Sequence, residues 1–462
     1  MMARRFAILS VVGAALLLAV PALAQKTAPL PWLENTYPSQ YKAPVGQDML
    51  LRGATILDGV GGRIDGGDVL IRGGRIVAVG KGLTNPGVDV VDAAGRWVTP
   101  GVIDVHSHDG TFVLPLTAID REASDVSETS TPNAADTWVK TAVNAQDMAF
   151  DRALSNGVTT IQILPGSTPI FAGRSIVVKP IHGATIWDMK AVGNIQGFKM
   201  ACGENPKSWG AEKDNEGPTS RQGVIAYMRQ AFLDAQRYRR AVEQARAGAG
   251  AMPPRDLKLE ALAGILAGDI RVNLHCYRAG DIAAMLSLAK EFKFRIGAIH
   301  HATEAYKIPG LLREAGTCAA VWADWWGFKM EAQDAVRAGA PMLEQAGVCV
   351  MMHSDSPADG QRLNIAAAKA AAAGRRIGID IPPERMIKWT TSNPAKLLGM
   401  ETQIGTLAPG CKADVVLWSG NPFSIYSKAD LMLIDGAVAY DRSKPPGTPV
   451  SDFELGREGA PR

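Results

Sequence analysis

The sequence predicts an α/β fold: a (β/α)8 TIM-like barrel with a small β-sandwich built by both ends of the chain. Apolar strands and amphipathic helices alternate through residues 99–400, which is the pattern of a parallel sheet. Both flanks carry short strands between glycine turns instead, and histidines recur where the central strands end. At 462 residues, the chain can hold one large barrel and a small second domain.

Residues 1–24 have the three parts of a secretory signal peptide. Arg4 and Arg5 precede an apolar stretch that reaches Val20, and an A-x-A cleavage motif ends at Ala24. The alternative is a membrane anchor, but the stretch is short for a span of about 20 residues and no stop-transfer pattern follows it. We therefore expect export to the periplasm or the medium, with no membrane span after cleavage.

Composition excludes some partners. The formal net charge is only +3 and no basic block stands out, so we expect no nucleic acid partner. We expect a small-molecule substrate, and a homo-oligomer as the assembly. The odd number and scattered spacing of the cysteines argue against a disulfide framework, and we expect most of them to be small buried hydrophobes. The five cysteines are Cys202, Cys276, Cys318, Cys349 and Cys411.

The two flanks share one β-rich texture. From Asp48 to Trp97, Val and Ile alternate between Gly-Gly and Asn-Pro turns, which is an antiparallel pattern. The same texture returns near the C-terminus as "IGTLAPGCKADVVLWSG" and "LMLIDGAVAY". We expect residues 25–98 and 401–445 to form one small β-sandwich, followed by a tail over 446–462.

The middle of the chain repeats a strand-then-helix unit. The strand "IRVNLH" leads into a helix over Asp281–Phe292, whose apolar residues have helical spacing. Strands "RIGAIHH", "CAAVWADW" and "VCVMMHSD" follow, separated by predicted helices at Ile308–Glu314 and Glu331–Gln345. A closed barrel is the natural solution over 99–400; an open doubly wound sheet is the alternative, although no phosphate-binding glycine fingerprint follows a strand. The polar segment Glu204–Gln222 is predicted to be a long loop or lid.

Histidines and one aspartate fall at the predicted strand ends, where barrel enzymes carry their chemistry. In "TPGVIDVHSHDG", His106 and His108 are two residues apart, so both side chains address the same face of the strand. Taken singly, each such residue is more often a satisfied polar group, but their repetition in successive strand-to-helix turns predicts a metal site. The later strand ends supply His275, His300, His301 and Asp355.

These motifs, taken in order, resemble the amidohydrolase superfamily. The segment "PGVIDVHSH" follows a β-rich flank, and strand-end His, His and Asp come after it. The later "TSNPAKLLGM" and "IGTLAPGCKADVVLW" look like the superfamily's final barrel helix and its return into the sandwich. The resemblance spans nearly all of the mature chain and is greatest to the imidazolonepropionase-like and exported dipeptidase-like branches.

The resemblance implies a set of metal ligands. His106 and His108 would bind the more buried metal, and His275 with one of the paired histidines would bind the second. Of that pair His301 is preferred, because strand alternation and the H-x-T-E context place it inward. His300 would then point into the barrel wall.

The resemblance also implies the bridging and proton-transfer groups. Asp355 matches the aspartate that binds metal and takes a proton from the attacking water. The segment "GFKMAC" resembles the one in which a carboxylated lysine bridges two metals, which makes Lys199 the candidate. A plain salt-bridged lysine is the alternative, and Glu204 in "CGENPK" is the alternative bridge. Imidazole and carboxylate ligands suit two Zn²⁺, with other divalent ions left open.

Candidate substrate-binding residues follow from their positions. Tyr277 and Arg278 come directly after His275, and the Arg278 guanidinium suits a carboxylate. A solvated or salt-bridged surface charge is the alternative for the charged candidates, and packing in the barrel wall is the alternative for the tryptophans. The further candidates are His182 near another strand end, Lys207 and Arg221 in the polar segment, and Trp322, Trp325 and Trp326.

Together these expectations describe an exported, metal-dependent amidohydrolase. A metal-activated hydroxide would hydrolyse a C–N bond in a small molecule, such as an amide, a peptide or a cyclic amide. The same metal site acting on an ester, lactone or phosphoester is the alternative, since the ligands do not select the bond. A non-catalytic metal-binding protein is a third hypothesis, disfavoured because every expected ligand is present.

Overall fold

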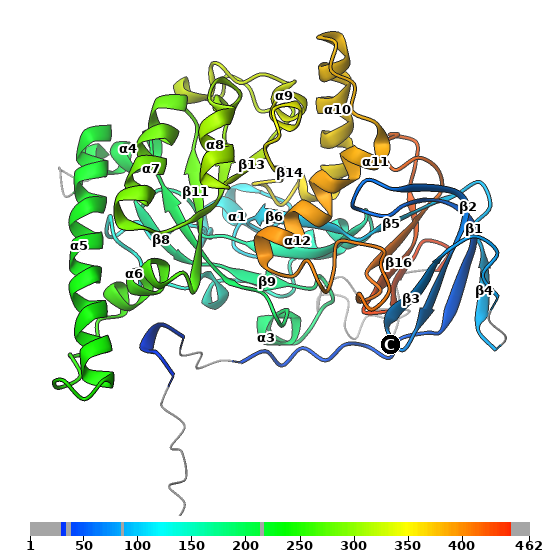
Figure 1. The fold of residues 1–462 in the computed structure, drawn as a ribbon, viewed down its shortest axis with the longest axis horizontal. Coiled ribbons are helices and arrows are strands. Elements are labelled where there is room, and N and C mark those ends of the chain that lie inside the picture. Colours follow the sequence, from blue (N-terminus) through cyan, green and yellow to red (C-terminus); the bar gives the residue numbers. More distant parts are fainter. Residues whose placement is uncertain (1–28, 34–37, 85–86, 213–216, 445–462) are drawn as a thin grey trace, which may run out of the picture.

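The computed structural model describes residues 29–33, 38–84, 87–212 and 217–444. The expected signal peptide, 1–24, and the expected tail, 446–462, lie outside the described residues. Within the described ranges, no helix is both long and apolar enough to cross a membrane. The strands and helices form a mixed α/β structure with three sheets (Figure 1).

Strands from both flanks of the chain combine in one eight-stranded sheet. They are β1 (Met49–Leu57), β2 (Arg63–Arg72), β3 (Arg75–Gly80), β4 (Asp89–Asp92), β5 (Trp97–Pro100), β15 (Val415–Trp418), β16 (Ala429–Ile434) and β17 (Ala437–Asp441). The order is β17-β16-β15-β5-β1-β2-β3, and β4 pairs with β1 off this path. β15 runs antiparallel to β5, so the two flanks meet at this pair (Figure 1). The hydrogen bonds connect all eight strands into one branched sheet in the region where the sequence predicts a small β-sandwich.

The central strands form two further sheets. They are β6 (Val102–Ser107), β7 (Val158–Ile163), β8 (Phe171–Arg174), β9 (Ile176–Val178), β10 (Gln196–Ala201), β11 (Ile270–Cys276), β12 (Ile296–His301), β13 (Cys318–Val321) and β14 (Val350–Met352). One sheet has the order β14-β13-β12-β11-β10-β8 and is parallel from β10 to β14, as the alternating pattern predicts. The other has the order β6-β7-β9.

The two central sheets touch through single backbone hydrogen bonds. One runs from Asp355 N to His106 O (2.7 Å) and another from Ser175 N to Gly197 O (3.0 Å). Among the described residues, no strand ladder joins β14 to β6, where the sequence predicts a closed barrel. β14 has only 3 residues and its partner β13 only 4, so little strand is left to build such a ladder.

Helices follow most of the central strands. They are α1 (Ala118–Glu122), α2 (Ala149–Leu154), α3 (Ile186–Met189), α4 (Glu204–Glu212), α5 (Arg221–Arg246), α6 (Leu257–Ala267), α7 (Ala279–Phe292), α8 (Pro309–Ala315), α9 (Gly339–Gln345), α10 (Leu363–Arg376), α11 (Pro383–Met386) and α12 (Ser392–Leu398). α7, α8 and α9 follow β11, β12 and β13 in turn. The rings of Phe232 on α5 and Phe294 stack at 4.7 Å, and Phe171 on β8 packs edge-on at 5.6 Å, so aromatic contacts hold α5 against the sheet.

Two local predictions are wrong. The segment Glu204–Gln222, predicted to be a loop, begins with α4, which a 2.7 Å hydrogen bond from Lys329 to Asn205 anchors. The helix predicted over Glu331–Gln345 is reduced to α9, because the buried Glu331 carboxylate accepts a hydrogen bond from the first N–H of α4 (2.9 Å). In both places tertiary contacts override the local propensity.

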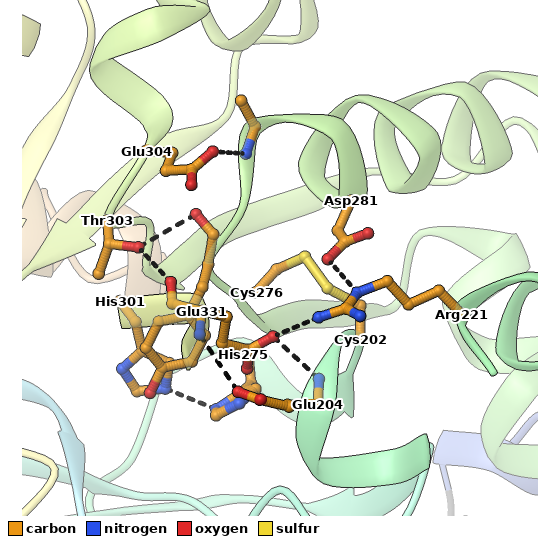
Figure 2. Close-up of a disulfide and its surroundings, with 12 residues drawn as sticks. Cys202, Glu204, Arg221, His275, Cys276, Asp281, His301, Thr303, Glu304 and Glu331 are labelled. Carbon is orange, nitrogen blue, oxygen red and sulfur yellow. Dashed lines mark hydrogen bonds and ion pairs between the residues drawn. A yellow bond between two sulfur atoms is a disulfide. The ribbon is translucent and has the colours of Figure 1, made fainter. Parts of the chain in front are cut away.

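The prediction that the cysteines form no disulfide framework is also wrong. Cys202 is bonded to Cys276, 74 residues away, and Cys318 to Cys349, 31 residues away, while Cys411 is free and buried. Each bond joins two neighbouring parallel strands or their ends, β10 with β11 (Figure 2) and β13 with β14. Spacing along the chain carries no signal for such pairs, because strand order makes them neighbours.

A buried ion pair between Lys179 and Asp414 connects the flank sheet to the central strands. Lys179 Nζ contacts the Asp414 carboxylate and the Thr160 hydroxyl, and the two charged side chains are 1% and 2% exposed. We predict that Lys179→Met lowers the free energy of unfolding by about 3–5 kcal/mol, because it leaves a buried carboxylate unpaired. Lys290→Met, which removes an exposed pair with Glu314, should cost less than about 1 kcal/mol in the same urea titration. Similar losses in the two variants would contradict this assignment.

Candidate metal centre

Three central strands bring polar side chains to one point. His106 lies on β6, Lys199 lies on β10, and Asp355 follows β14. Asp355 Oδ1 is 2.9 Å from His106 Nε2 and 3.0 Å from His108 Nε2, while Lys199 Nζ is 2.9 Å from the same His106 nitrogen. The first cluster therefore consists of His106, His108, Lys199 and Asp355, as the sequence predicts.

A second cluster, His275 and His301, lies beside the first. His301 Nε2 is 2.6 Å from His275 Nδ1, and His301 Nδ1 is 4.0 Å from Asp355 Oδ2. The rings of Tyr277 and Trp322 stack on the His301 ring, with centroids at 4.8 Å and 4.2 Å. These two aromatic contacts fix the orientation of the imidazole, which a metal ligand requires.

His300 does not point away from the clusters, contrary to the prediction. The His300 ring centroid is 4.8 Å from the His106 ring centroid. The His301 ring centroid is 5.3 Å from the same His106 centroid. A φ of +73° at His301 breaks the strand alternation, so two consecutive side chains approach the same neighbour. His300 Nε2 is 3.0 Å from Asn273 Oδ1, which places His300 as a supporting residue. Asp355 also has a left-handed backbone (φ +55°), and such conformations concentrate at functional sites.

His353, a residue that the strand-end pattern did not single out, is buried in the same region. Its ring centroid is 5.1 Å from those of both His106 and His301. The ligand atoms of these three histidines lie within 4.8 Å of one another, as do those of His106, His108 and Asp355. The sequence does contain a pattern that indicates His353 as a site residue. His353 precedes Asp355 by two residues, which is the same spacing that separates His106 from His108.

Burial sets the protonation states of the clusters. It lowers the pKa of His106, His275 and His301 well below the usual range, and that of His353 to about 3. Burial raises the pKa of Asp355, but its interactions with His106 and His301 and its hydrogen bonds with His106 and His108 outweigh this and hold that pKa well below its usual range. Neutral imidazoles and an ionised carboxylate are the forms that bind a metal ion.

The donor set fits a divalent cation. Several ring nitrogens are buried without a hydrogen-bond partner in the part of the chain that the structure describes: His106 Nδ1, His275 Nε2, His301 Nδ1 and His353 Nδ1. Buried polar atoms without a partner are costly, so each requires a reason. Imidazole nitrogens and a carboxylate are the ligands that zinc takes, and a shared cation satisfies the close approach of His275 and His301.

Glu204, the alternative bridging residue, bonds elsewhere. Its carboxylate accepts a hydrogen bond from the Glu331 N–H (3.2 Å), and the Glu331 carboxylate accepts from the Glu204 N–H (2.9 Å) and from Arg221 (3.3 Å), as Figure 2 shows. Arg221 also donates to Asp281 (2.8 Å). The geometry therefore favours Lys199 as the residue beside the histidines, and it places Arg221 in an ion-pair network rather than at the clusters.

The remaining substrate-binding candidates differ in their surroundings. Tyr277 and Trp322 contact His301 directly. Arg278 is exposed and Lys207 is half-buried, and neither side chain makes a hydrogen bond or ion pair with any residue in the described ranges. The loop after β13 carries the other two candidates, Trp325 and Trp326.

His182 lies apart from the clusters, contrary to its selection as a substrate-binding candidate. β9 runs antiparallel to β7, so the chain leaving β9 heads toward the edge where β7 begins. There His182 Nε2 is 2.9 Å from Asp151 Oδ1, and His182 Nδ1 is 3.1 Å from the Ala145 carbonyl oxygen. These contacts indicate that His182 closes a turn.

Comparison with known proteins identifies relatives of this chain. A family model described as "Amidohydrolase family" matches residues 97–443. The amidohydrolase tasK of Hapsidospora irregularis is 30% identical over 403 residues, which cover 81% of this chain and 40% of that protein. The N-acyl-D-aspartate deacylase of Alcaligenes xylosoxydans xylosoxydans is 49% identical over 72 residues, 16% of this chain and 14% of that enzyme. The match to a solved amidohydrolase from Thermotoga maritima MSB8 has 32% identity and a TM-score of 0.78, and covers 85% of this chain and 100% of that one.

The pair of His182 and Asp151 makes stability depend on pH. The Asp151 carboxylate, 2.9 Å from Nε2, raises the pKa of His182 above 6.5, so the pair stabilises fully below pH 6.5 and loses its contribution as the pH rises through the raised pKa. We predict that His182→Gln lowers the free energy of unfolding by up to about 1 kcal/mol near pH 5.5, and by less near pH 8.5. Urea titrations at the two pH values measure this, and Asp151→Asn should show the same trend. Equal losses at both pH values would refute it.

Proposed function

The chain belongs to the amidohydrolase family, and on that premise we propose that it is an exported, metal-dependent hydrolase of C–N bonds in small molecules. The observation that carries the proposal is the convergence of His106, His108 and Lys199 around the Asp355 carboxylate. Amides, peptides and cyclic amides are all within its scope. An ester, lactone or phosphoester is the second candidate, because the ligand set does not select the leaving group.

Two divalent ions, proposed to be zinc, would be held by the two clusters. His106, His108 and Asp355 would hold one ion, and His275 with His301 would hold the other. When bound, such ions supply a hydroxide nucleophile and polarise the substrate carbonyl. His353 is a further candidate ligand, because its ligand atom lies within 4.8 Å of those of His106 and His301.

Lys199 is proposed to be carboxylated and to lie between the two ions. Burial lowers the pKa of its amine to about 8, so a neutral fraction is present near pH 7. The neutral amine adds to carbon dioxide and releases a proton. The resulting carbamate is an anion that can bridge two cations, which an ammonium group cannot do.

Asp355 is proposed to carry the proton during hydrolysis. Its Oδ1 faces His106 and His108 and its Oδ2 lies 4.0 Å from His301, so the carboxylate is next to both clusters. The low pKa keeps it ionised and able to accept a proton from the attacking water. As the new C–O bond forms and the C–N bond breaks, Asp355 returns that proton to the leaving nitrogen.

We further propose that the protein is exported and that its central strands close into a barrel. The two disulfides support an oxidising compartment, where such bonds persist, and a signal peptide over 1–24 would direct the chain there. We propose that the two central sheets together form the (β/α)8 barrel over 99–400 and that residues 25–98 and 401–445 form its small sandwich. We also propose that the chain assembles as a homo-oligomer.

Metal content tests the proposed centre. We predict about two zinc equivalents in the purified protein by elemental analysis. Lys199→Ala should lower this number towards one, whereas Glu204→Ala should keep both ions, because that carboxylate bonds to the Glu331 N–H. The proposal fails if no metal binds after reloading, or if metal is lost only from the Glu204→Ala variant.

The bond that is cleaved tests the proposed reaction. We predict hydrolysis of N-acyl amino acids or dipeptides, with kcat reduced about 10²–10⁴-fold in Asp355→Asn, because the proton carrier is lost. Asp380→Asn, at a side chain that is 75% exposed, should keep full activity, and metal content is measured for both variants. An amide and an ester with the same acyl group separate the two candidate bonds. Cleavage of the ester alone would favour the second candidate.

A further inference from the structure

The loop that joins β13 to α9, residues 322–338, exposes an unusual amount of apolar surface. Trp326, Phe328 and Met330 are 61%, 53% and 74% exposed. Proteins rarely gather large apolar side chains at the surface unless a ligand or partner covers them. The loop begins directly after Val321, the last residue of β13. Val321 pairs with His301, the last residue of the neighbouring strand β12, so the loop begins beside His301.

Aromatic rings connect this surface to His301. The Phe328 ring is 5.7 Å from that of Trp325 and 6.0 Å from that of Trp322, and the two tryptophans stack at 4.8 Å. Trp322 in turn stacks on His301 at 4.2 Å. A pocket beside these rings has a mostly apolar wall, and its lining includes His301, Trp322, Trp325, Trp326, Val336 and Arg337. An apolar group bound there would lie beside the candidate metal centre.

Arg337 supplies a cation to this pocket. Its exposed side chain makes no hydrogen bond or ion pair with any residue that the structure describes. The three acids of the loop already have cationic partners: Asp324 has Lys369, Asp334 has Lys307, and Glu331 has Lys329 and Arg221. A guanidinium binds a carboxylate through two parallel hydrogen bonds, so a substrate carboxylate is the group that this site is equipped to take.

We propose that this pocket binds the amino-acid part of the substrate, with a bulky apolar side chain against the tryptophans and a free carboxylate on Arg337. The inference rests on the proposed function and names its substrate class: N-acyl amino acids, or dipeptides that end in an aromatic or large aliphatic residue. In such a substrate the scissile nitrogen is attached to the same carbon as the side chain and the carboxylate. The amide therefore lies at the His301 side of the pocket.

A second pocket, which shares Trp322, Ala323, Asp324 and Trp325 with the first, provides a contrast. Its charged lining residues are Asp324, Asp359, Arg362 and Lys369. Two acids face two bases there, so the charges balance without a ligand. Arg362 is exposed, as Arg337 is, and its side chain too makes no hydrogen bond or ion pair with any described residue, which makes it a matched control.

Binding of small acids to the purified full-length protein tests the inference without turnover. The calorimetric probes are 3-phenylpropanoate, 3-phenylpropan-1-ol, which lacks the carboxylate, and propanoate, which lacks the ring. We expect 3-phenylpropanoate to bind about tenfold or more tightly than either of the others. In the Arg337→Gln variant, 3-phenylpropanoate should bind no more tightly than 3-phenylpropan-1-ol. In the Trp326→Ala variant, 3-phenylpropanoate should lose most of its higher affinity relative to propanoate. Arg362→Gln should change the affinity by less than about twofold.

Several results would overturn the inference. One is an equal loss of affinity in Arg337→Gln and Arg362→Gln, and another is equal affinity for 3-phenylpropanoate and propanoate. A third is a Trp326→Ala variant with unchanged binding and an altered sedimentation coefficient, because the apolar surface would then be a contact between copies of the chain. None of the probes contains an amide, so failure of the proposed reaction is seen separately, as intact binding selectivity without hydrolysis of any N-acyl amino acid.

Discussion

The limited access of the Asp355 carboxylate to water, with only 19% of its side chain exposed, is the constraint on which the centre of the molecule depends. A largely desolvated ionised carboxylate is costly unless hydrogen-bonding groups surround it, and His106 and His108 place ring nitrogens 2.9 Å and 3.0 Å from it. The Asp355 N–H also donates to the His106 carbonyl at 2.7 Å, and Ser354 donates to Asp104 through both its N–H and its hydroxyl. These bonds hold the end of β14 against β6. Contact between the two central sheets and assembly of the first cluster therefore depend on the same few bonds.

The clusters contain features that oppose folding locally. His301 and Asp355 have left-handed backbones, which cost on the order of 1 kcal/mol or more for non-glycine residues, and buried imidazoles lack partners within the described structure. The surroundings hold these conformations in place. Tyr277 and Trp322 pack on His301, and a disulfide joins Cys276, the neighbour of a cluster histidine, to the end of β10. Conflict between local preference and global structure is expected where a protein has a function.

Chemistry and selectivity reside in different parts of the fold. Strand ends carry the residues proposed to hydrolyse the substrate, whereas the loop over 322–338 carries the rings and the cation proposed to select it. This loop is joined to the start of α4 by the reciprocal hydrogen bonds of Glu204 and Glu331, so it has a defined position beside the clusters. A shared scaffold with a variable loop is how one fold accommodates many substrates, and the fold alone does not name the substrate.

The sequence by itself determined the alternation of strands and helices, the meeting of the two β-rich flanks, and most of the residues at the candidate centre. These features follow from local patterns: a spacing of two along a strand, or a position at a strand end. Only the tertiary structure decided the contacts between strands. It paired the cysteines, brought His353 to the clusters, turned His300 towards His106, engaged Glu204 with Glu331 and separated His182 from the centre. Such contacts depend on strand order, strand direction and a left-handed residue at His301, none of which a one-dimensional pattern encodes.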